Sequence, residues 1–490
     1  MSDLAADAKG RGFVRELGLL DAVMIVTGSM IGSGIFIVSA NVARQVGAAG
    51  WLVLAWAVSG LLVTAAALSY GELAAMMPRV GGQYVYLKEA YSPLLGFLFG
   101  WTLFLVIQSG TIAAVAVAFA SFLGVLVPGV SSTAWIVPPI DLSPGYAVSL
   151  SVQQLVAILL IVLLSVVNTY GVRVGKLIQN SFTWAKMLAL AALIVLGVAL
   201  GQNAAGFSDP WTPQNVVPAA EGGLPFWIVF CLALTGPLFS ASAWNDVTFA
   251  AAEIKNPKRN LPIALAGGVG LVSLLYVLAN VAYVRALPIE AIQTAPENRV
   301  GTAALEAILG PAGAGLMAVA IMISTFGCNN GLILAGARVY YAMAKDGLFF
   351  RSIGRLNRFR VPAVGLAVQC VWASLLVIPR TRLASEDGTP RYGNVYSNLL
   401  EYVVFAVLLF YVLTILGVFI LRRKRPDAER PYRAFGYPLV PLFYIAGALL
   451  VVACLLVYRT ETTWPGLAIV LTGIPVYLLW RRGADISEDL

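Results

Sequence analysis

Residues 28–34 read Gly-Ser-Met-Ile-Gly-Ser-Gly and lie inside the first long apolar run of the chain, residues 20–46. A glycine inside a helix costs about 1 kcal/mol relative to alanine. Three glycines within seven residues therefore predict that the helix is interrupted here. Unwound backbone at membrane depth is tolerated where it lines a cavity, so this stretch is the first candidate for a binding site.

The composition of the whole chain places that run in a membrane protein. Of the 490 residues, 59% are hydrophobic and 11% are charged, and the mean hydropathy is +0.84. Soluble domains carry about 25% charged residues, so a water-soluble enzyme is excluded. At about 20 residues per spanning helix, the apolar runs predict an all-α polytopic protein with 12 transmembrane helices, at residues 20–46, 51–77, 93–127, 150–169, 179–201, 225–250, 262–285, 312–342, 362–380, 398–421, 437–457 and 464–480.

A second interruption is predicted in the sixth run, where residues 235–245 read Thr-Gly-Pro-Leu-Phe-Ser-Ala-Ser-Ala-Trp-Asn. The proline cannot donate a backbone hydrogen bond. The first and sixth runs hold the same position in two successive sets of five, a pattern typical of inverted-repeat transporters with a site at mid-membrane. The predicted organisation is a cytoplasmic segment at 1–19, a first inverted repeat at 20–201 (helices 1–5), a second at 225–421 (helices 6–10), helices 11 and 12 at 437–480, and a cytoplasmic tail at 481–490.

The distribution of Lys and Arg predicts the orientation. With the amino terminus inside, the cytoplasmic segments hold 24 of the 32 basic residues. Cytoplasmic loops are enriched in basic residues, so both termini are expected to be cytoplasmic. The polar start of the chain shows no small-residue cleavage site before the first run, which indicates a retained helix. The chain has no Asn-x-Ser/Thr sequon, and we expect a multi-pass protein of a bacterial plasma (inner) membrane.

The two interruptions together indicate the chemistry of the ligand. The backbone amides of Ser33 and Gly34, at the start of the outer half-helix, are suited to a carboxylate because of the helix dipole. Carbonyls around Met30, Phe239 and Ser242 are suited to an ammonium group. This pairing favours a zwitterionic amino acid. The alternative is that each glycine run only permits close packing of helices, and the coincidence of two interruptions argues against it.

Four motifs in this order resemble the amino acid–polyamine–organocation transporters, and among them the bacterial L-type amino acid transporters. They are Gly28–Phe36, Tyr70–Tyr86, Phe239–Asn245 with its continuation Glu253–Pro262, and Arg430–Pro438. They span most of the chain. The resemblance implies that the helix 1 segment binds the substrate, with the carboxylate held at Ser33 and Gly34; the implied segment is Met30, Ile31, Gly32, Ser33 and Gly34.

In helix 6, the resemblance implies a role for residues on either side of the predicted break. Phe239 matches the aromatic gate that closes over the substrate from outside, and Asn245 matches a polar side chain beside the substrate. We expect Ser240 and Ser242 in the same site. The family usually has glycine at 242 and 243, and the serine and alanine found here indicate a smaller substrate.

Lys186 lies inside the fifth run and is a functional candidate because ionisable residues within spans are costly. Its side chain could instead extend to the inner interface. The resemblance implies that its ammonium takes the place of the sodium ion of related carriers. There it would bridge helix 1 carbonyls and the helix 8 hydroxyls of Ser324 and Thr325, so transport should not depend on sodium.

Three further acids lie inside or at the ends of runs. Glu72, with Arg79 shortly after it, is interpreted as an ion pair that fixes the cytoplasmic gate. Glu253, beside three basic residues at 255–259, is interpreted in the same way. Asp246 is expected to pair with a nearby polar group.

The leading functional prediction is sodium-independent transport of neutral L-amino acids by alternating access, most simply as exchange. A proton-coupled symporter is the alternative, and a polyamine or cationic amino acid carrier would need more acids near the pocket. The chain has no histidine and no phosphate-binding or metal motif, so no enzyme, cofactor, metal or nucleic-acid function is expected. In some carriers of the L-type family that the chain resembles, a cysteine in the loop between helices 3 and 4 links a heavy chain. The predicted loop 128–149 has no cysteine here, so we expect no disulfide-linked heavy chain and a monomer in the lipid bilayer.

Overall fold

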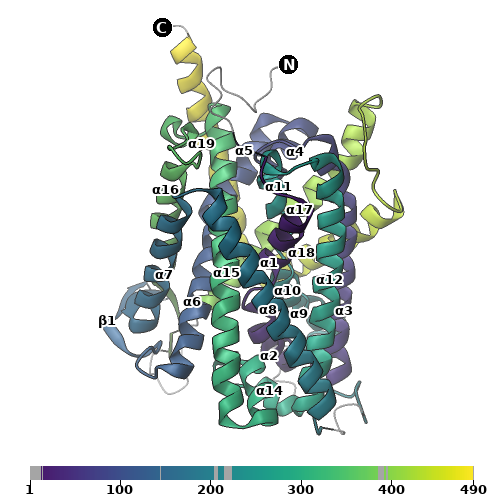
Figure 1. Cartoon of the computed structure of the whole chain (residues 1–490), viewed down its shortest axis with the longest axis vertical. Coiled ribbons are helices and arrows are strands. Elements are labelled where there is room, and N and C mark those ends of the chain that lie inside the picture. The colour runs from purple at the N-terminus through teal and green to yellow at the C-terminus, as the bar shows by residue number, and fades with distance from the viewer. Residues whose placement is uncertain are drawn as a thin grey trace.

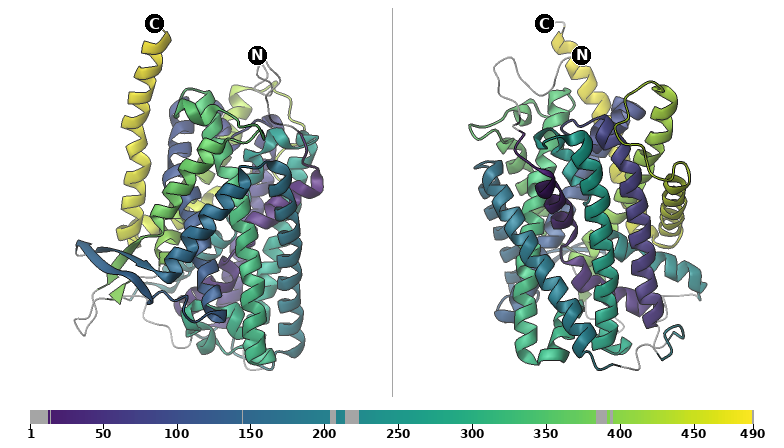
Figure 2. Two further views of the ribbon diagram at one scale, coloured as in Figure 1. Left: turned by 60° about the vertical axis from the view of Figure 1, so that its left-hand side comes forward. Right: turned by 45° about the vertical axis from the view of Figure 1, so that its right-hand side comes forward.

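The computed structural model describes residues 13, 15–143, 145–203, 208–213, 223–383, 391–392 and 395–488. These residues form a bundle of helices running along one axis (Figure 1). A small sheet projects sideways from one end of the bundle (Figure 2, left). The helical bundle follows from an apolar sequence whose backbone must satisfy its own hydrogen bonds in lipid.

The first half of the chain supplies the helices that carry the first interruption. They are α1 (Leu19–Met30), α2 (Gly34–Val46), α3 (Ala49–Met76), α4 (Gln83–Ala90), α5 (Pro93–Thr102), a π-helical turn (Leu103–Ile107), α6 (Gln108–Leu126), α7 (Val152–Asn168) and α8 (Val172–Leu200). Their ends carry ordinary stop and start signals. Pro93 follows the N-cap Ser92, and Ser151 forms a capping box with Gln154 at the start of α7.

The second half begins with three short helices in place of one long one. The helices are α9 (Phe226–Ala233), α10 (Thr235–Ser240), α11 (Asp246–Phe249), α12 (Pro257–Ala286), α13 (Ile289–Gln293), α14 (Val300–Leu309), α15 (Pro311–Lys345), α16 (Ala363–Leu376), α17 (Val395–Lys424), α18 (Leu439–Tyr458) and α19 (Thr460–Glu488). Short 3₁₀ turns lie at Ala251–Glu253, Pro296–Asn298 and Arg351–Gly354.

Nine helical stretches within the described residues are long and apolar enough to cross a membrane. Shorter apolar helices lie at Val152–Asn168, Phe226–Ser240, Val300–Leu309 and Ala363–Leu376. The protein is therefore a polytopic, mainly helical membrane protein. The prediction of twelve crossings exceeds this number because three of the predicted spans form helices below the length of a full crossing.

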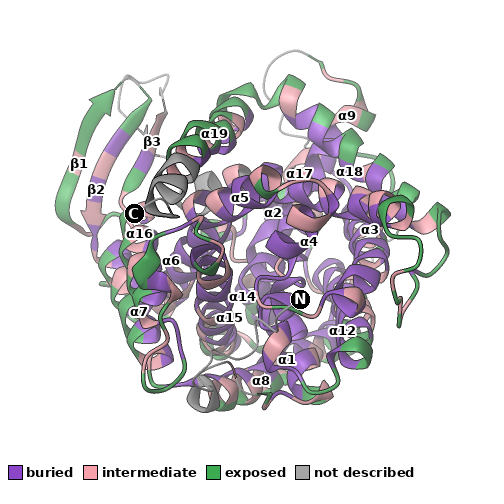
Figure 3. Cartoon of the chain, turned by 90° about the horizontal axis from the view of Figure 1, so that it is seen from above, coloured by how far each residue is buried: buried purple, intermediate pink, exposed green. Residues whose placement is uncertain are grey.

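The bundle has a buried interior and an exposed rim, as Figure 3 shows in the view along its axis. The apolar window of α1 and α2 is 94% buried and that of α5 to α6 is 89% buried, whereas that of α19 is 28% buried. An apolar helix at the rim leaves its side chains facing lipid. The first interruption thus lies in the most enclosed part of the bundle.

A small antiparallel sheet, not predicted from the sequence, accompanies the helices. Its strands β1 (Trp135–Ser143), β2 (Tyr146–Ser151), β3 (Pro379–Leu383) and β4 (Arg391–Tyr392) are antiparallel in the order β1-β2-β3-β4. The sheet joins two predicted external loops that are far apart in the sequence. It lies toward the end of the bundle that holds α14, while α4 and the end of α19 lie at the opposite end (Figures 1 and 2).

Candidate functional site

The two interrupted helices meet in the interior of the bundle. α1 ends at Met30 and α2 begins at Gly34, so residues 31–33 form a non-helical link. A side chain at Gly34 would collide with Ser240 at the end of α10. Glycine is therefore required at 34 for this close approach. The link places the buried Ser33 and Gly34 at the N-terminal end of α2, where the Phe36 amide donates to the Ser33 carbonyl at 3.0 Å.

Lys186 of α8 reaches this link from the side. Its side chain is 0% exposed, so it does not extend to the membrane interface. Its Nζ donates to the carbonyl of Gly28 at 2.5 Å and to the carbonyl of Ile31 at 2.9 Å. Both oxygens belong to the interruption, and the ammonium therefore provides donors to carbonyls that the break leaves without helical partners.

Helix α15 contacts the same link through two side chains. Ser324 Oγ donates to the carbonyl of Ile31 at 3.1 Å and lies 3.4 Å from the carbonyl of Gly32. Cys328 Sγ lies 3.2 Å from the carbonyl of Ser29, a contact that the sequence analysis missed. The expectation for Thr325 was wrong, because its hydroxyl donates to the carbonyl of Ile321 in its own helix at 2.8 Å.

Tyr276 of α12 connects the two interruptions, and the sequence analysis missed it. Its hydroxyl lies 2.7 Å from the carbonyl of Met30 and 3.1 Å from the carbonyl of Ser240. The Met30 carbonyl also accepts from the Gly32 amide at 2.8 Å. The expectation that this carbonyl is open to a ligand is therefore not met in this conformation. A tyrosine inside an apolar run was the available signal, since a buried hydroxyl needs a partner.

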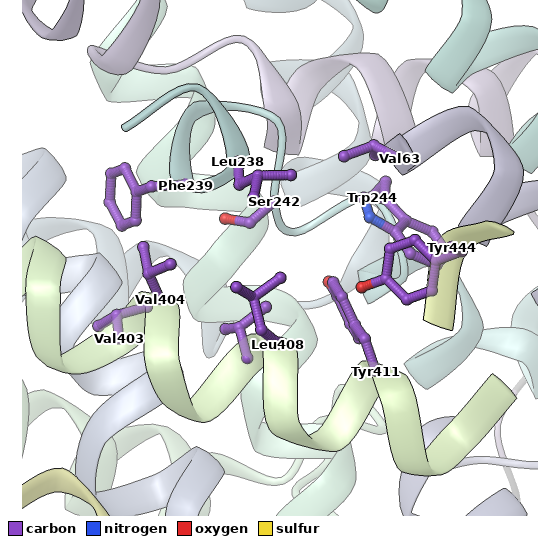
Figure 4. A pocket seen from close by; sticks show the side chains of 11 residues that line it. Val63, Leu238, Phe239, Ser242, Trp244, Val403, Val404, Leu408, Tyr411 and Tyr444 are labelled. Carbon is purple, nitrogen blue, oxygen red and sulfur yellow. The ribbon is translucent and has the colours of Figure 1, made fainter. Parts of the chain in front are cut away.

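A cavity lies beside the second interruption. Figure 4 shows Phe239, Ser242, Trp244 and Tyr411 around it. Ser242 lies between Phe239 on one side and the rings of Trp244 and Tyr411 on the other. The wall opposite is apolar and comes mainly from α17; it consists of Val403, Val404, Val407 and Leu408. An aromatic ring, a hydroxyl and an aliphatic wall are groups that commonly line ligand pockets, and the space between them in this conformation is about 10 Å³, enough for one water molecule.

A second cavity shares Ser242 and also contains Asn245 and Asp246. Asn245 is held by protein groups on both sides. Its Nδ2 donates to Gln83 Oε1 at 2.8 Å, and its Oδ1 accepts from the Tyr411 hydroxyl at 2.7 Å. This side chain, expected beside a substrate, thus links the interrupted helix to α4 and α17. Gln83 and Tyr411 also line this cavity, as do Gln108 and Thr111 of α6.

The predicted pairing of Glu72 with Arg79 is wrong. Glu72 Oε2 lies 2.6 Å from Arg422 Nη2, and its Oε1 lies 3.4 Å from Arg430 Nε. Arg79 is 51% exposed in its side chain and lies 3.4 Å from Glu89. The reason is that α3 ends before Arg79, so the chain turns away while Glu72 still faces the bundle.

The predicted neighbours of Glu253 are wrong as well. Glu253 pairs with Arg338 of α15, with Oε1 to Nε at 2.5 Å and Oε2 to Nη2 at 3.2 Å. Both side chains are 1% exposed. Lys258, one of the basic residues nearby in the sequence, pairs instead with the exposed Glu429. The buried pair joins the end of the interrupted helix to α15, and a gating role for either acid stays a prediction.

The polytopic helical bundle and its two interrupted helices are consistent with a membrane carrier. Comparison with known proteins identifies the family. The family model described as amino acid permease matches residues 17–479. The chain belongs to this amino acid transporter family of the amino acid–polyamine–organocation superfamily, which confirms the resemblance.

Several relatives are similar over nearly the whole chain. The serine/threonine exchanger SteT of Bacillus subtilis is 29% identical, covering 95% of this chain and 97% of its own. The b(0,+)-type amino acid transporter 1 of Mus musculus is 29% identical, covering 97% and 90%. The large neutral amino acids transporter small subunit 2 of Homo sapiens is 32% identical, covering 98% and 83%. All three are named as amino acid transporters or exchangers.

Proposed function

We propose that this protein exchanges neutral L-amino acids across the membrane by alternating access and without sodium. The substrate carboxylate binds at Ser33 and Gly34, and its side chain enters the cavity beside Phe239 and Ser242. The names of the relatives, which include an exchanger, support amino acid exchange as the reaction.

The observation that carries the proposal is the position of Lys186. Its ammonium holds the carbonyls of Gly28 and Ile31 at the interruption of helix 1. A metal cation bound at an interrupted helix would also be coordinated by backbone carbonyl oxygens, as the Lys186 ammonium is here. Since the protein supplies its own positive charge there, a bound sodium ion has no role at this point.

A chain of neutral hydrogen bonds supports alternating access. Gln83 Nε2 donates to Thr414 Oγ1 at 2.9 Å, and Gln83 Oε1 accepts from Asn245. With the bond from Tyr411 to Asn245, these contacts join α4, the interrupted helix and α17 on the side of the site that faces α4. In the proposed cycle this chain breaks when the path opens on the side of α4, and Phe239 closes the opposite side.

The proposal includes a topology and a location. The shorter helices α7 and α16 and the composite helix of α9, α10 and α11 are counted as crossings, which gives the twelve crossings and two inverted repeats predicted from the sequence. Both termini then face the cytoplasm of a bacterial cell, in its inner membrane. The absence of cysteine from residues 128–149 supports a subunit that works without a disulfide-linked partner.

The test is uptake of labelled neutral amino acids into vesicles that contain the purified protein and unlabelled amino acid. We expect the same rate when external sodium is replaced by choline and when the vesicle interior is made more alkaline than the medium. A rate that requires sodium would contradict the role given to Lys186. Uptake into empty vesicles that is driven by the proton gradient would favour the proton-coupled symporter instead.

A further inference from the structure

The small sheet of β1 to β4 has an apolar face. Side chains alternate between the two faces along a strand, and residues directly opposite each other in an antiparallel pair share a face. In β2, Val148 lies opposite Ile140 of β1 and Pro379 of β3, and Leu150 lies opposite Val137. One face of the sheet, which we call the apolar face, therefore consists of Val137, Ile140, Tyr146, Val148, Leu150 and Pro379.

The opposite face of the sheet is polar. Asp141 and Arg380 both lie opposite Ala147 on this face. Asp141 Oδ2 is 3.2 Å from Arg382 Nη1, and the guanidinium of Arg380 is 4.9 Å from the centre of the Trp135 ring. The polar face thus holds its charged side chains against each other and against an aromatic ring.

The exposure of the two faces is the reverse of that expected in water. An antiparallel sheet with one solvated face places its apolar side chains inward and its polar ones outward. Here Ser149 of the polar face is buried, and its Oγ donates to Gln154 Oε1 at the start of α7 at 3.1 Å. On the apolar face Val137 is 40% exposed, Ile140 55% and Tyr146 46%. Such an exposed apolar surface marks a contact with a membrane or a partner.

The sheet lies at the end of the bundle where a membrane-spanning helix begins. The hydroxyls of Tyr146 and Tyr402 are 3.2 Å apart, and Tyr402 is the first residue of the span Tyr402–Lys424. Tyrosine is enriched at this depth, where the hydrocarbon of a bilayer meets the headgroups. Figure 3 shows the sheet outside the ring of helices, with β1 farthest from the bundle. The sheet is therefore placed at the membrane interface, beside the bundle.

Lipid is also the medium that the adjoining helix faces. β2 ends at Ser151, and α7 begins at the next residue. The exposed side chains of α7 include an apolar set, consisting of Leu155, Leu159, Val162, Leu163 and Val166. In a membrane protein, exposed apolar side chains on a helix face the acyl chains. Because β2 leads directly into this helix, the apolar face of the sheet adjoins the same lipid.

We propose that the apolar face of this sheet rests on the lipid bilayer, with its side chains at the boundary between headgroups and acyl chains, and anchors this end of the carrier in the interface. In the proposed topology the lipid belongs to the outer leaflet. Elements that bind a membrane without crossing it carry one apolar and one polar face, as this sheet does. The inference goes beyond the proposed function and does not depend on which substrate is carried.

The experiment attaches a polarity-sensitive nitrobenzoxadiazole fluorophore to a cysteine on either face of β1. Ile140→Cys places the label on the apolar face, and Asp141→Cys is the matched control at the next residue, on the polar face. The purified full chain is placed in phosphatidylcholine vesicles, and labelled wild-type protein gives the background from the four native cysteines. Two quenchers are compared, a nitroxide on the lipid acyl chain near the headgroup and iodide in the buffer on both sides.

The label at 140 should emit at shorter wavelength than the label at 141 and lose its fluorescence to the nitroxide lipid, while iodide quenches it little. The label at 141 should show the reverse, because it faces water. Quenching of both labels by iodide and of neither by the lipid would overturn the inference, since the apolar face would then stand in water.

A second copy of the chain is the other occupant that the purified system allows. Protection of the label at 140 from both quenchers, lost when the protein is diluted in the lipid, would show that a second copy covers the apolar face and would also overturn the inference. Thermal unfolding of each variant should match the wild type. Should Ile140→Cys lower the unfolding temperature, Val137→Cys carries the label on the same face and is read in the same way.

Discussion

Replacing Lys186 by alanine should abolish amino acid exchange in reconstituted vesicles. The variant loses two charge-assisted hydrogen bonds, to the carbonyls of Gly28 and Ile31. Loss of such bonds to a charged group costs about 3 kcal/mol or more in total, a factor of at least about 100 in an equilibrium constant. The break of helix 1 is then no longer held in the shape that binds substrate. Labelled amino acid uptake into preloaded vesicles measures the effect.

Lys186→Arg should not restore exchange, because a planar guanidinium cannot replace a compact ammonium between two carbonyls. The matched control is Lys258→Ala, which removes an exposed lysine whose ion pair with Glu429 is 52% and 72% exposed. Exposed pairs contribute about 0–1 kcal/mol, so exchange by this variant should equal that of the wild type. Exchange by Lys186→Ala at the wild-type rate would exclude a structural or coupling role for the ammonium.

The second large effect is expected on stability, at the pair of Glu253 and Arg338. Both side chains are 1% exposed. Arg338→Met leaves the Glu253 carboxylate buried without its partner, and breaking a buried pair in this way costs about 3–5 kcal/mol. The purified variant should therefore unfold at lower temperature and lower denaturant concentration than the wild type in the same detergent.

A double variant tests whether the cost comes from the unpaired charge. Glu253→Gln together with Arg338→Met removes both charges, so it should recover much of the stability that the single variant loses. A double variant that is as unstable as the sum of the two single variants would show that the residues contribute independently. Arg79→Met is the control, since this arginine is largely exposed and its contact with Glu89 is long.

Local sequence signals predicted the first interruption and singled out Lys186, whereas the contact between the two was implied by the family resemblance. The glycines at 28, 32 and 34 and the lysine inside an apolar run are each unusual within a membrane span. The structure places the Lys186 ammonium on the carbonyls of that interruption. The glycine-rich interruption and the lysine within a span could be predicted because their physical cost is visible without knowing which helices are neighbours.

The partners of Glu72 and Glu253 could not be predicted in the same way. Arg422 lies 350 residues from Glu72 along the chain, and Arg338 lies 85 residues from Glu253. The prediction chose basic residues close in sequence, but helix direction and helix ends decide which side chains face each other. The pairing of strand 146–151 with strand 379–383 escaped prediction for the same reason, since the two strands come from loops that meet only in the folded bundle.

Efflux from vesicles tests the proposed exchange most directly. Vesicles containing the protein are loaded with a labelled neutral amino acid and diluted into buffer with or without the same unlabelled amino acid. Rapid efflux only when unlabelled amino acid is present outside is the predicted result, because the empty carrier does not return. Equal efflux into both buffers would contradict obligatory exchange and show that the unloaded protein crosses freely between its two states.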